Sequence, residues 1–118
     1  MIEGDAKRVT IHVDEWDRWE HQNLHTAIVE MLRREGCAGA TVLKAVEGFG
    51  ADSLRSGANV MRLSQDATMM VIFVDSAERV DHVMPIIDEM VSGGGGLITV
   101  EDVHVRRYAH SDRGASAD

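Results

Sequence analysis

Six apolar residues in a row, MMVIFV at positions 69–74, constrain the fold of this chain more than any other feature of its sequence. Successive side chains of a β-strand point to opposite faces, so an unbroken apolar run is typical of a strand that is covered on both faces. The chain has 118 residues, which is enough for one domain with one hydrophobic core. Each face of this strand must therefore be covered, by other parts of the domain or by a second copy of the chain.

Three further strands are predicted from shorter patterns. They lie at residues 7–13, 40–46 and 97–108. The first alternates most clearly, because Val9, Ile11 and Val13 are apolar while the residues between them are polar. Residues 60–63 could extend another strand.

Two helices are predicted between these strands. Asn23 is a suitable N-cap for the first helix, apolar residues follow at helical spacing, and Gly36 can end it. Asp75 precedes Glu78 by three positions, which predicts a capping box that opens the second helix. Pro85 lies inside the apolar pattern of this helix, so the helix is expected to start late or to bend there.

The order strand, helix, strand, strand, helix, strand is that of the ferredoxin-like pattern. We therefore predict an α+β fold, βαββαβ, with a four-stranded antiparallel sheet that carries both helices on one face. No helix is left for the other face, which predicts self-association of the chain. The predicted domain spans residues 7–109, with disordered segments at residues 1–6 and 110–118.

Three connections are expected to be loops. Residues 14–22 are polar with two tryptophans, and residues 51–59 hold glycine, serine and aspartate without periodicity, so the connection 51–68 is expected to be mobile. Ser92 is followed by four glycines at residues 93–96. Four consecutive N–H groups there could form an anion-binding nest, or the segment could be a flexible connector only.

Charge and cysteine content exclude several classes of protein. The chain has 12 Lys and Arg against 20 Asp and Glu, a net charge of −8, and lacks the clustered basic residues that nucleic acids require. Its single cysteine, Cys37, cannot form an intramolecular disulfide and is expected to be a small, partly buried apolar residue. No apolar run is long enough to span a membrane and the first residues do not resemble a signal peptide, so a cytoplasmic location is expected.

The polar residues do not assemble into a recognisable catalytic or metal site. His21 and His25 are four positions apart, which suits two metal ligands only if a helix begins before His21. Glu15 and Asp17 resemble an acid pair, but neighbours two positions apart need not converge. We therefore predict a binding protein without a metal cofactor, and not an enzyme. A small ferredoxin-like enzyme that uses Glu15, Asp17 and the histidines, and a purely structural oligomer with no ligand, stay open as alternatives.

One segment resembles a known signature. Residues 36–50, GCAGATVLKAVEGFG, resemble the G-x-x-G-x-T-V and G-F-G motifs that PII signalling proteins carry where a helix leads into a strand and a loop. The chain is more similar still to the PII-like family called domain of unknown function 190. That family has an E-x-D segment, matched by residues 15–17, a helix ending in Leu-Arg, matched by residues 32–33, and an L-S-x-D segment, matched by residues 63–66. The resemblance covers about residues 8 to 108.

This resemblance implies a homotrimer whose sheets face inward, with ligand sites in the clefts between subunits. It also implies an adenine nucleotide as ligand and a loop, here residues 51–68, that docks on a partner protein such as a membrane transporter. The ligand-binding residues that it implies lie in the strand before the loop, at the base of the loop and within it, in the glycine-rich loop and late in the last strand. They are Thr41, Gly48, Phe49, Gly50, Arg62, Gly93, Gly94, Gly95, Gly96 and Arg106.

Two departures from the PII pattern bear on the ligand. PII proteins have a phosphate-binding lysine directly after the glycine-rich loop, but Leu97 stands at that position. The arginines near the end of the last strand, Arg106 and Arg107, are out of register with theirs. Fewer positive charges favour AMP or ADP over ATP. The only tyrosine is Tyr108, so nucleotidyl transfer to a tyrosine in the loop is not expected.

Overall fold

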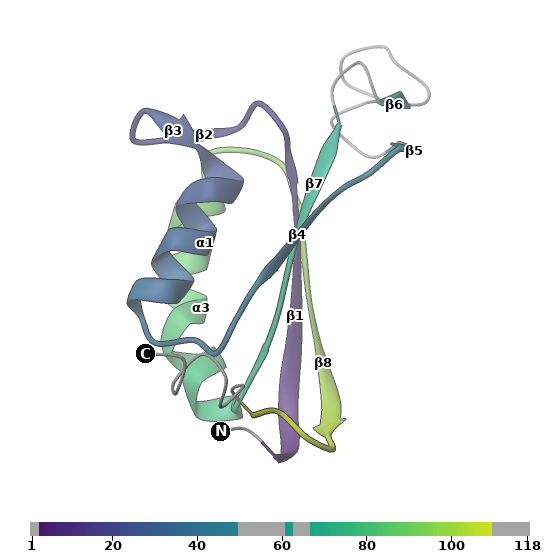
Figure 1. The fold of residues 1–118 in the computed structure, drawn as a ribbon. Helices are drawn as coiled ribbons and strands as arrows, with labels where there is room; N and C mark the ends of the chain where they lie inside the picture. The colour runs from purple at the N-terminus through teal and green to yellow at the C-terminus, as the bar shows by residue number, and fades with distance from the viewer. Residues whose placement is uncertain (1–2, 50–60, 63–66, 110–118) are drawn as a thin grey trace, which may run out of the picture.

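A computed structural model describes residues 3–49, 61–62 and 67–109 of the chain. Its main sheet has four strands, shown in Figure 1, and they are antiparallel to their neighbours. These strands are β1 (Gly4–Asp14), β4 (Thr41–Lys44), β7 (Thr68–Asp75) and β8 (Leu97–Val105). In the order β4-β7-β1-β8, the strands β1 and β7 lie in the middle and each pairs with two neighbours. This is the ferredoxin-like arrangement, so the predicted fold class is confirmed.

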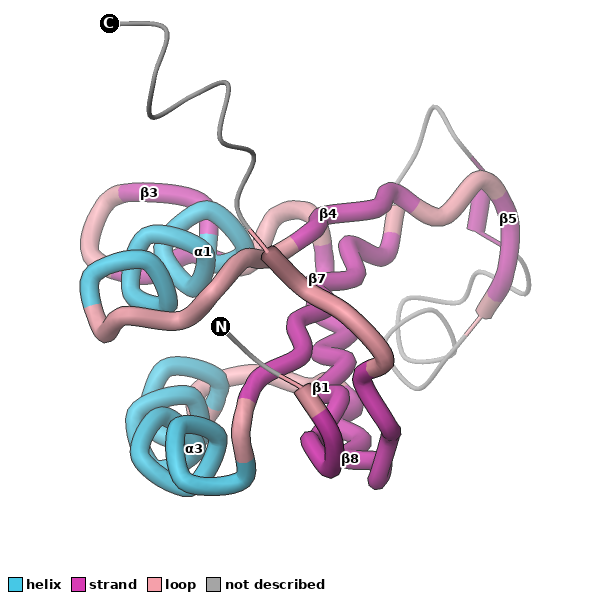
Figure 2. Tube along the Cα trace, turned by 60° about the horizontal axis from the view of Figure 1, so that its bottom comes forward, coloured by secondary structure: helices cyan, strands magenta, loops and turns pink. Residues whose placement is uncertain are grey.

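Two helices, α1 (Leu24–Arg34) and α3 (Ala77–Val91), cover one face of this sheet. Figures 1 and 2 show both helices on the same side. Alternate residues of β1 and β7 point toward them and are almost completely buried, and the helices bury their apolar stripes in return. The core consists of Val9, Ile11, Val13, Met69, Val71 and Phe73 from the strands and Leu24, Ala27, Ile28, Met31, Leu32, Val80, Val83, Ile87 and Met90 from the helices.

The face of the sheet opposite the helices, which we call the open face, has no covering layer in the described part of the chain. Met70, Ile72 and Val74 of β7 point to it and are half-buried, while Met69, Val71 and Phe73 point into the core. The expectation that this strand is covered on both faces is therefore met on one face only within a single chain. The other face remains a surface of half-exposed apolar side chains.

The predicted loop at residues 14–22 is partly wrong, because it contains a short hairpin. The strands β2 (Arg18–Trp19) and β3 (Gln22–Asn23) pair across Glu20 and His21, whose φ angles are +45° and +74°. Two-residue turns need this left-handed backbone, which is usually signalled by glycine or asparagine. Neither stands at the turn, so the sequence carried no signal for it.

The start of the second helix also differs from the prediction. Its N-cap is Ser76 rather than Asp75, and the Ser76 hydroxyl accepts a hydrogen bond from the Arg79 N–H at 3.1 Å. The helix runs unbroken through Pro85. Pro85 is exposed, so the carbonyl that loses its usual partner can be hydrated. Asn23 does occupy the N-cap position of α1, but its side chain accepts from Arg18 instead of capping the helix.

Several boundaries shift as well. Gly4–Ala6, predicted to be disordered with the rest of residues 1–6, pair with the end of β8. The last strand ends at Val105 rather than Tyr108. Beyond β4 the chain continues into β5 (Glu47–Gly48), which pairs with β6 (Met61–Arg62). The predicted tail at 110–118 and most of the 51–68 loop lie outside the described residues.

No helix in the described ranges is both long enough and apolar enough to cross a membrane.

Candidate functional site

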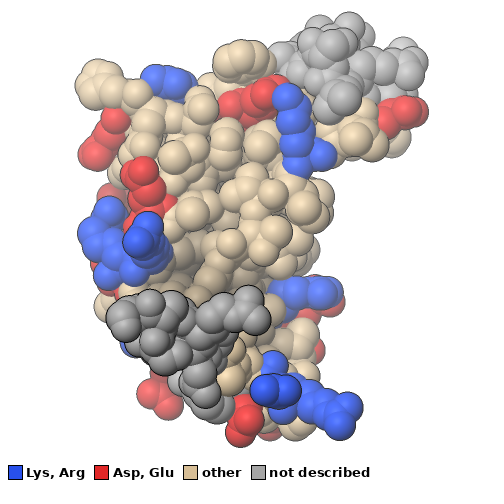
Figure 3. Space-filling model, in the orientation of Figure 1, with Lys and Arg blue, Asp and Glu red and all other residues tan. Residues whose placement is uncertain are grey.

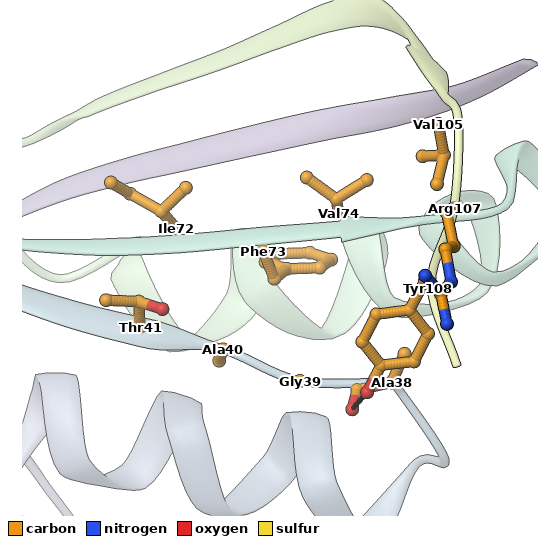
Figure 4. Close-up of a pocket in the computed structure, with 10 residues that line it drawn as sticks. All are labelled: Ala38, Gly39, Ala40, Thr41, Ile72, Phe73, Val74, Val105, Arg107 and Tyr108. Atoms are coloured by element: carbon orange, nitrogen blue, oxygen red, sulfur yellow. Dashed lines mark hydrogen bonds between the residues drawn. The ribbon is translucent and has the colours of Figure 1, made fainter. Parts of the chain in front are cut away.

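A groove of about 490 Å³ lies on the open face, between the edge strand β4 and the chain that follows β8 (Figure 4). Figure 4 shows Ile72, Val74 and Thr41 on the same side of the sheet, with Tyr108 reaching toward residues 38 and 39. Most of its lining residues are apolar, which suits a flat, weakly polar ring better than a small ion. The lining residues are Ala38, Gly39, Ala40, Thr41, Ile72, Phe73, Val74, Val105, Arg107 and Tyr108.

One wall of the groove is the turn between α1 and β4. Gly36, with a φ of +85°, ends the helix, and the Cys37 N–H donates a hydrogen bond to the Leu32 carbonyl at 3.0 Å. The next residue, Ala38, is held at both of its backbone polar groups. Its N–H donates to the Asp75 carboxylate at 2.8 Å, and its carbonyl accepts from the Tyr108 hydroxyl at 2.9 Å.

The groove has one prominent positive group. Arg107 is exposed, and it forms no hydrogen bond or ion pair with any residue in the described ranges. Arg8, on the open face beside Val74, is already paired with Glu101 at 2.7 Å. Arg107 is therefore the guanidinium at this groove that can bind an anionic group of a ligand.

The glycine-rich loop forms a second, smaller pocket of about 210 Å³ with His12 and Leu97. A side chain at Gly96 would come within 2.9 Å of the His12 carbonyl oxygen, so only glycine fits there. Gly94 lies beside the Asp17 carboxylate, and its N–H donates to the Val91 carbonyl at 3.3 Å. The expectation of four free N–H groups is therefore wrong for Gly94, and the nearby carboxylate weakens the loop as a site for multiply charged anions.

The two pockets lie at opposite ends of β8. Leu97, its first residue, lines the glycine-rich pocket, and Val105, its last, lines the groove. A nine-residue strand is about 26 Å long, at roughly 3.3 Å per residue. A small ligand therefore cannot contact both pockets of one chain.

The structure places the remaining predicted site residues as follows. Thr41 lines the groove, while Gly48 lies in β5 and the backbone of Arg62 lies opposite Glu47 in β6. Phe49 is exposed at the base of the loop, and Gly50 lies outside the described residues. Arg106 is exposed and does not line the groove, whereas Arg107 and Tyr108 do. Sequence patterns did not indicate that Asp75 and Tyr108 belong to the walls of the groove, because each acts there through a contact with the distant residue Ala38.

Glu15 and Asp17 are occupied with separate partners. The Glu15 carboxylate pairs with the Lys44 ammonium at 2.8 Å, and this hydrogen bond holds the pKa of Glu15 below its usual range. The Asp17 carboxylate accepts from the Asp14 N–H at 3.0 Å. The helix α1 begins at Leu24, so His21 and His25 do not share a helix face. Within the described ranges, no three His, Cys, Asp or Glu residues are grouped to hold a metal ion.

His25 is expected to make folding sensitive to acid. Its Nδ1 is buried without a partner in the described structure, and burial lowers the pKa of His25 while the Glu15 charge opposes that shift. Below about pH 6.5 the unfolded chain binds a proton that the folded chain disfavours, so stability should fall as the pH decreases. Urea unfolding midpoints should therefore decrease between about pH 7.5 and about pH 5.5. This decrease in the midpoint should be smaller in His25→Gln than in the wild type. The exposed control His104→Gln should show the same decrease as the wild type. Equal pH profiles for the two variants would refute this role of His25.

Comparison with known proteins decides the family. The family model of domain of unknown function 190 (DUF190, Uncharacterized ACR) matches residues 6–105. The chain belongs to this family. A UPF0166 protein of Methanocaldococcus jannaschii is 33% identical to it, over 85% of this chain and 91% of that protein. A UPF0166 protein of Aquifex aeolicus is 26% identical, over 84% of this chain and 91% of that protein.

Solved structures support the same fold for this DUF190 protein. CPII from Thiomonas intermedia K12, a nitrogen regulatory PII-like protein, matches with a TM-score of 0.63 at 20% identity, over 87% of this chain and 90% of that chain. That CPII structure is bound to ADP, AMP and bicarbonate. Another CPII structure, bound to ADP and bicarbonate, has a TM-score of 0.63 at 23% identity, with the same coverage of both chains. The chain therefore has a PII-like fold.

Proposed function

We propose that this chain forms a homotrimer that binds AMP or ADP in the clefts between its subunits and regulates a partner protein through residues 51–68. The observation that carries the proposal is the pair of pockets at the two ends of β8, next to a half-apolar open face. The two pockets lie too far apart for one nucleotide to contact both within a single chain. Two neighbouring chains, packed through their open faces, can bring the groove of one against the glycine-rich pocket of the next.

Apolar residues on the open face support the trimer. Leu43, Met70 and Leu97 lie in one row across the sheet with His12, and Leu43 and Leu97 are 48% and 54% exposed in the single chain. In Figure 3 the middle of the sheet side carries almost no charged side chains, and those that this side carries lie toward its two ends. Apolar surface of this kind is typical of interfaces between subunits.

The groove supports a nucleotide with few phosphates. Its apolar walls suit a purine ring, and Arg107 offers a partner for one phosphate. Further phosphates would need further cations, but Leu97 stands after the glycine-rich loop and the Asp17 carboxylate lies beside Gly94. These features favour AMP or ADP. The CPII structures, which contain the same nucleotides, are consistent with this choice.

We propose binding rather than catalysis. Glu15 and Asp17, the residues of the enzyme alternative, are each engaged by a partner within the chain. The loop that begins after Phe49 supports a regulatory role, since β5 and β6 pair at its base and Phe49 is 68% exposed there. A partner protein, with a membrane transporter as the class that the PII resemblance implies, would contact residues 51–68.

Thermal unfolding tests the proposal. The purified protein is heated with AMP, ADP, ATP, cyclic nucleotides or bicarbonate, and only a ligand that binds the folded state raises the unfolding temperature. A rise with AMP or ADP that exceeds the rise with ATP is the expected result. The absence of a shift with any adenine nucleotide would refute the ligand assignment and favour the purely structural trimer.

Leu97→Lys is expected to change the nucleotide preference. The substitution places an ammonium group at the glycine-rich pocket, where a charge-assisted contact to an outer phosphate is worth about 1 kcal/mol. Leu97 also lies in the apolar row of the open face, so the titration uses Leu97→Lys samples that sediment like the wild type. In these samples the affinity for ATP relative to AMP should rise about fivefold, measured by calorimetric titration. Leu97→Met, which keeps the length of the side chain without its charge, should leave the ratio unchanged. Equal ratios in the two variants would show that no phosphate reaches this pocket.

A further inference from the structure

The four residues after β8, Arg106 to Ala109, cross the end of the sheet; we call them the C-terminal strap. The strands β8 and β4 are the two opposite edges of the sheet, yet Tyr108 donates its hydroxyl hydrogen bond to Ala38, at the entry to β4. Figure 1 shows the strap leaving β8 and passing back across the lower end of the sheet. The bond joins residues 70 positions apart, so it is a tertiary contact that determines where the strap lies.

The anchor point of the strap is itself rigid. The Ala38 N–H donates to the Asp75 carboxylate at 2.8 Å, and Asp75 is only 6% exposed. Asp75 also accepts from the N–H of Ser76, the N-cap of α3, at 2.8 Å. The Tyr108 hydroxyl is therefore bound to a turn that is already tied to the start of a helix.

This anchor selects which arginine of the strap faces the groove. Arg106 and Arg107 are neighbours, but the chain bends at Arg106 and only Arg107 lines the groove. With Tyr108 bound at Ala38, Arg107 lines the groove and Arg106 does not. Neither Arg106 nor Arg107 forms a hydrogen bond with the groove wall in the described ranges.

We infer that Tyr108 is a positioning residue of the ligand site: its hydroxyl anchors the strap so that Arg107, rather than Arg106, contacts an anionic group of the ligand. The inference rests on the proposed nucleotide function for the nature of that ligand. Without the hydroxyl the strap loses its hydrogen bond to Ala38, and Arg107 must be ordered when the ligand binds. Ordering one long side chain and its backbone lowers affinity by about tenfold.

Calorimetric titrations with AMP and adenosine separate this role from a general structural one. Tyr108→Phe removes the hydroxyl and keeps the ring, while Arg107→Gln and Arg106→Gln form a matched pair. Tyr108→Phe and Arg107→Gln should each weaken AMP binding about tenfold and leave adenosine binding unchanged, and Arg106→Gln should bind both like the wild type. Equal losses for AMP and adenosine in Tyr108→Phe, or a loss in Arg106→Gln in place of Arg107→Gln, would overturn the inference.

A second measurement tests the anchor without any ligand. Trypsin cleaves after arginine, and an anchored strap should resist cleavage after Arg106 and Arg107. Products identified by mass should show that Tyr108→Phe is cut there several times faster than the wild type, at equal unfolding temperature. Equal rates would overturn the anchor even if AMP binds. If the wild type binds neither AMP nor adenosine, the proposed function is overturned instead, together with the role of Arg107.

Discussion

Replacing Met70 with glutamate is expected to separate the proposed trimer into folded single chains. Met70 lies in the middle strands of the open face, opposite His12 of β1 and Leu43 of β4, and is half-buried even in the single chain. A trimer packed through this face would take the carboxylate out of water, with no lysine or arginine opposite it in the sheet and only the His12 imidazole beside it. That costs about 4 kcal/mol, or roughly a thousandfold in the association constant for each subunit. Sedimentation velocity, with circular dichroism of the same samples, measures the change.

Thr26→Glu is the matched control for this variant. Thr26 is exposed on α1, on the opposite side of the sheet, so the same negative charge should leave the trimer intact. The prediction fails if Met70→Glu sediments like the wild type. It also fails if that variant unfolds, because Met70 would then belong to the core of the single chain and not to an interface.

Asp75→Ala is expected to destabilise the chain by about 3 kcal/mol. The nearly buried carboxylate accepts the N–H groups of Ala38 and Ser76, and each donor left without a partner costs about 1–3 kcal/mol. Urea unfolding measures the loss. The wall of the groove should loosen as well, so AMP binding should weaken at temperatures where the variant is still folded.

Two neighbouring substitutions calibrate this effect. Asp75→Asn keeps one oxygen acceptor and should cost less than Asp75→Ala. Ser76→Ala removes a helix cap of ordinary strength and should cost about 1 kcal/mol. If Asp75→Ala costs no more than Ser76→Ala, the carboxylate does not hold the turn at Ala38.

The fold could be predicted because burial imposes a repeat on the sequence. The alternation of Val9, Ile11 and Val13 reflects the side of the sheet that faces the helices. The apolar run that follows Thr68 reflects both sides of a central strand, since its alternate residues face the helices and the open face. Where a choice depended on a distant partner, the prediction failed. Asp75 and Ser76 are both good N-caps, and Ser76 takes the role because Asp75 also accepts the distant Ala38 N–H.

The candidate site was less predictable than the fold. Thr41 could be proposed because it lies in a motif shared with a known family, and the structure puts it in the groove. The choice between Arg106 and Arg107 depends on the path of the chain after β8. That path depends on the hydrogen bond from Tyr108 to Ala38, and no local pattern encodes a contact across 70 positions.

Native mass spectrometry of the wild-type protein with AMP or ADP tests the central claim most directly. One spectrum reports the number of chains and the number of bound nucleotides. The expected result is a species of three chains that carries up to three nucleotides, because each proposed cleft joins the groove of one chain to the glycine-rich pocket of the next. A single chain that binds nucleotide on its own, or a trimer that binds none, would contradict it.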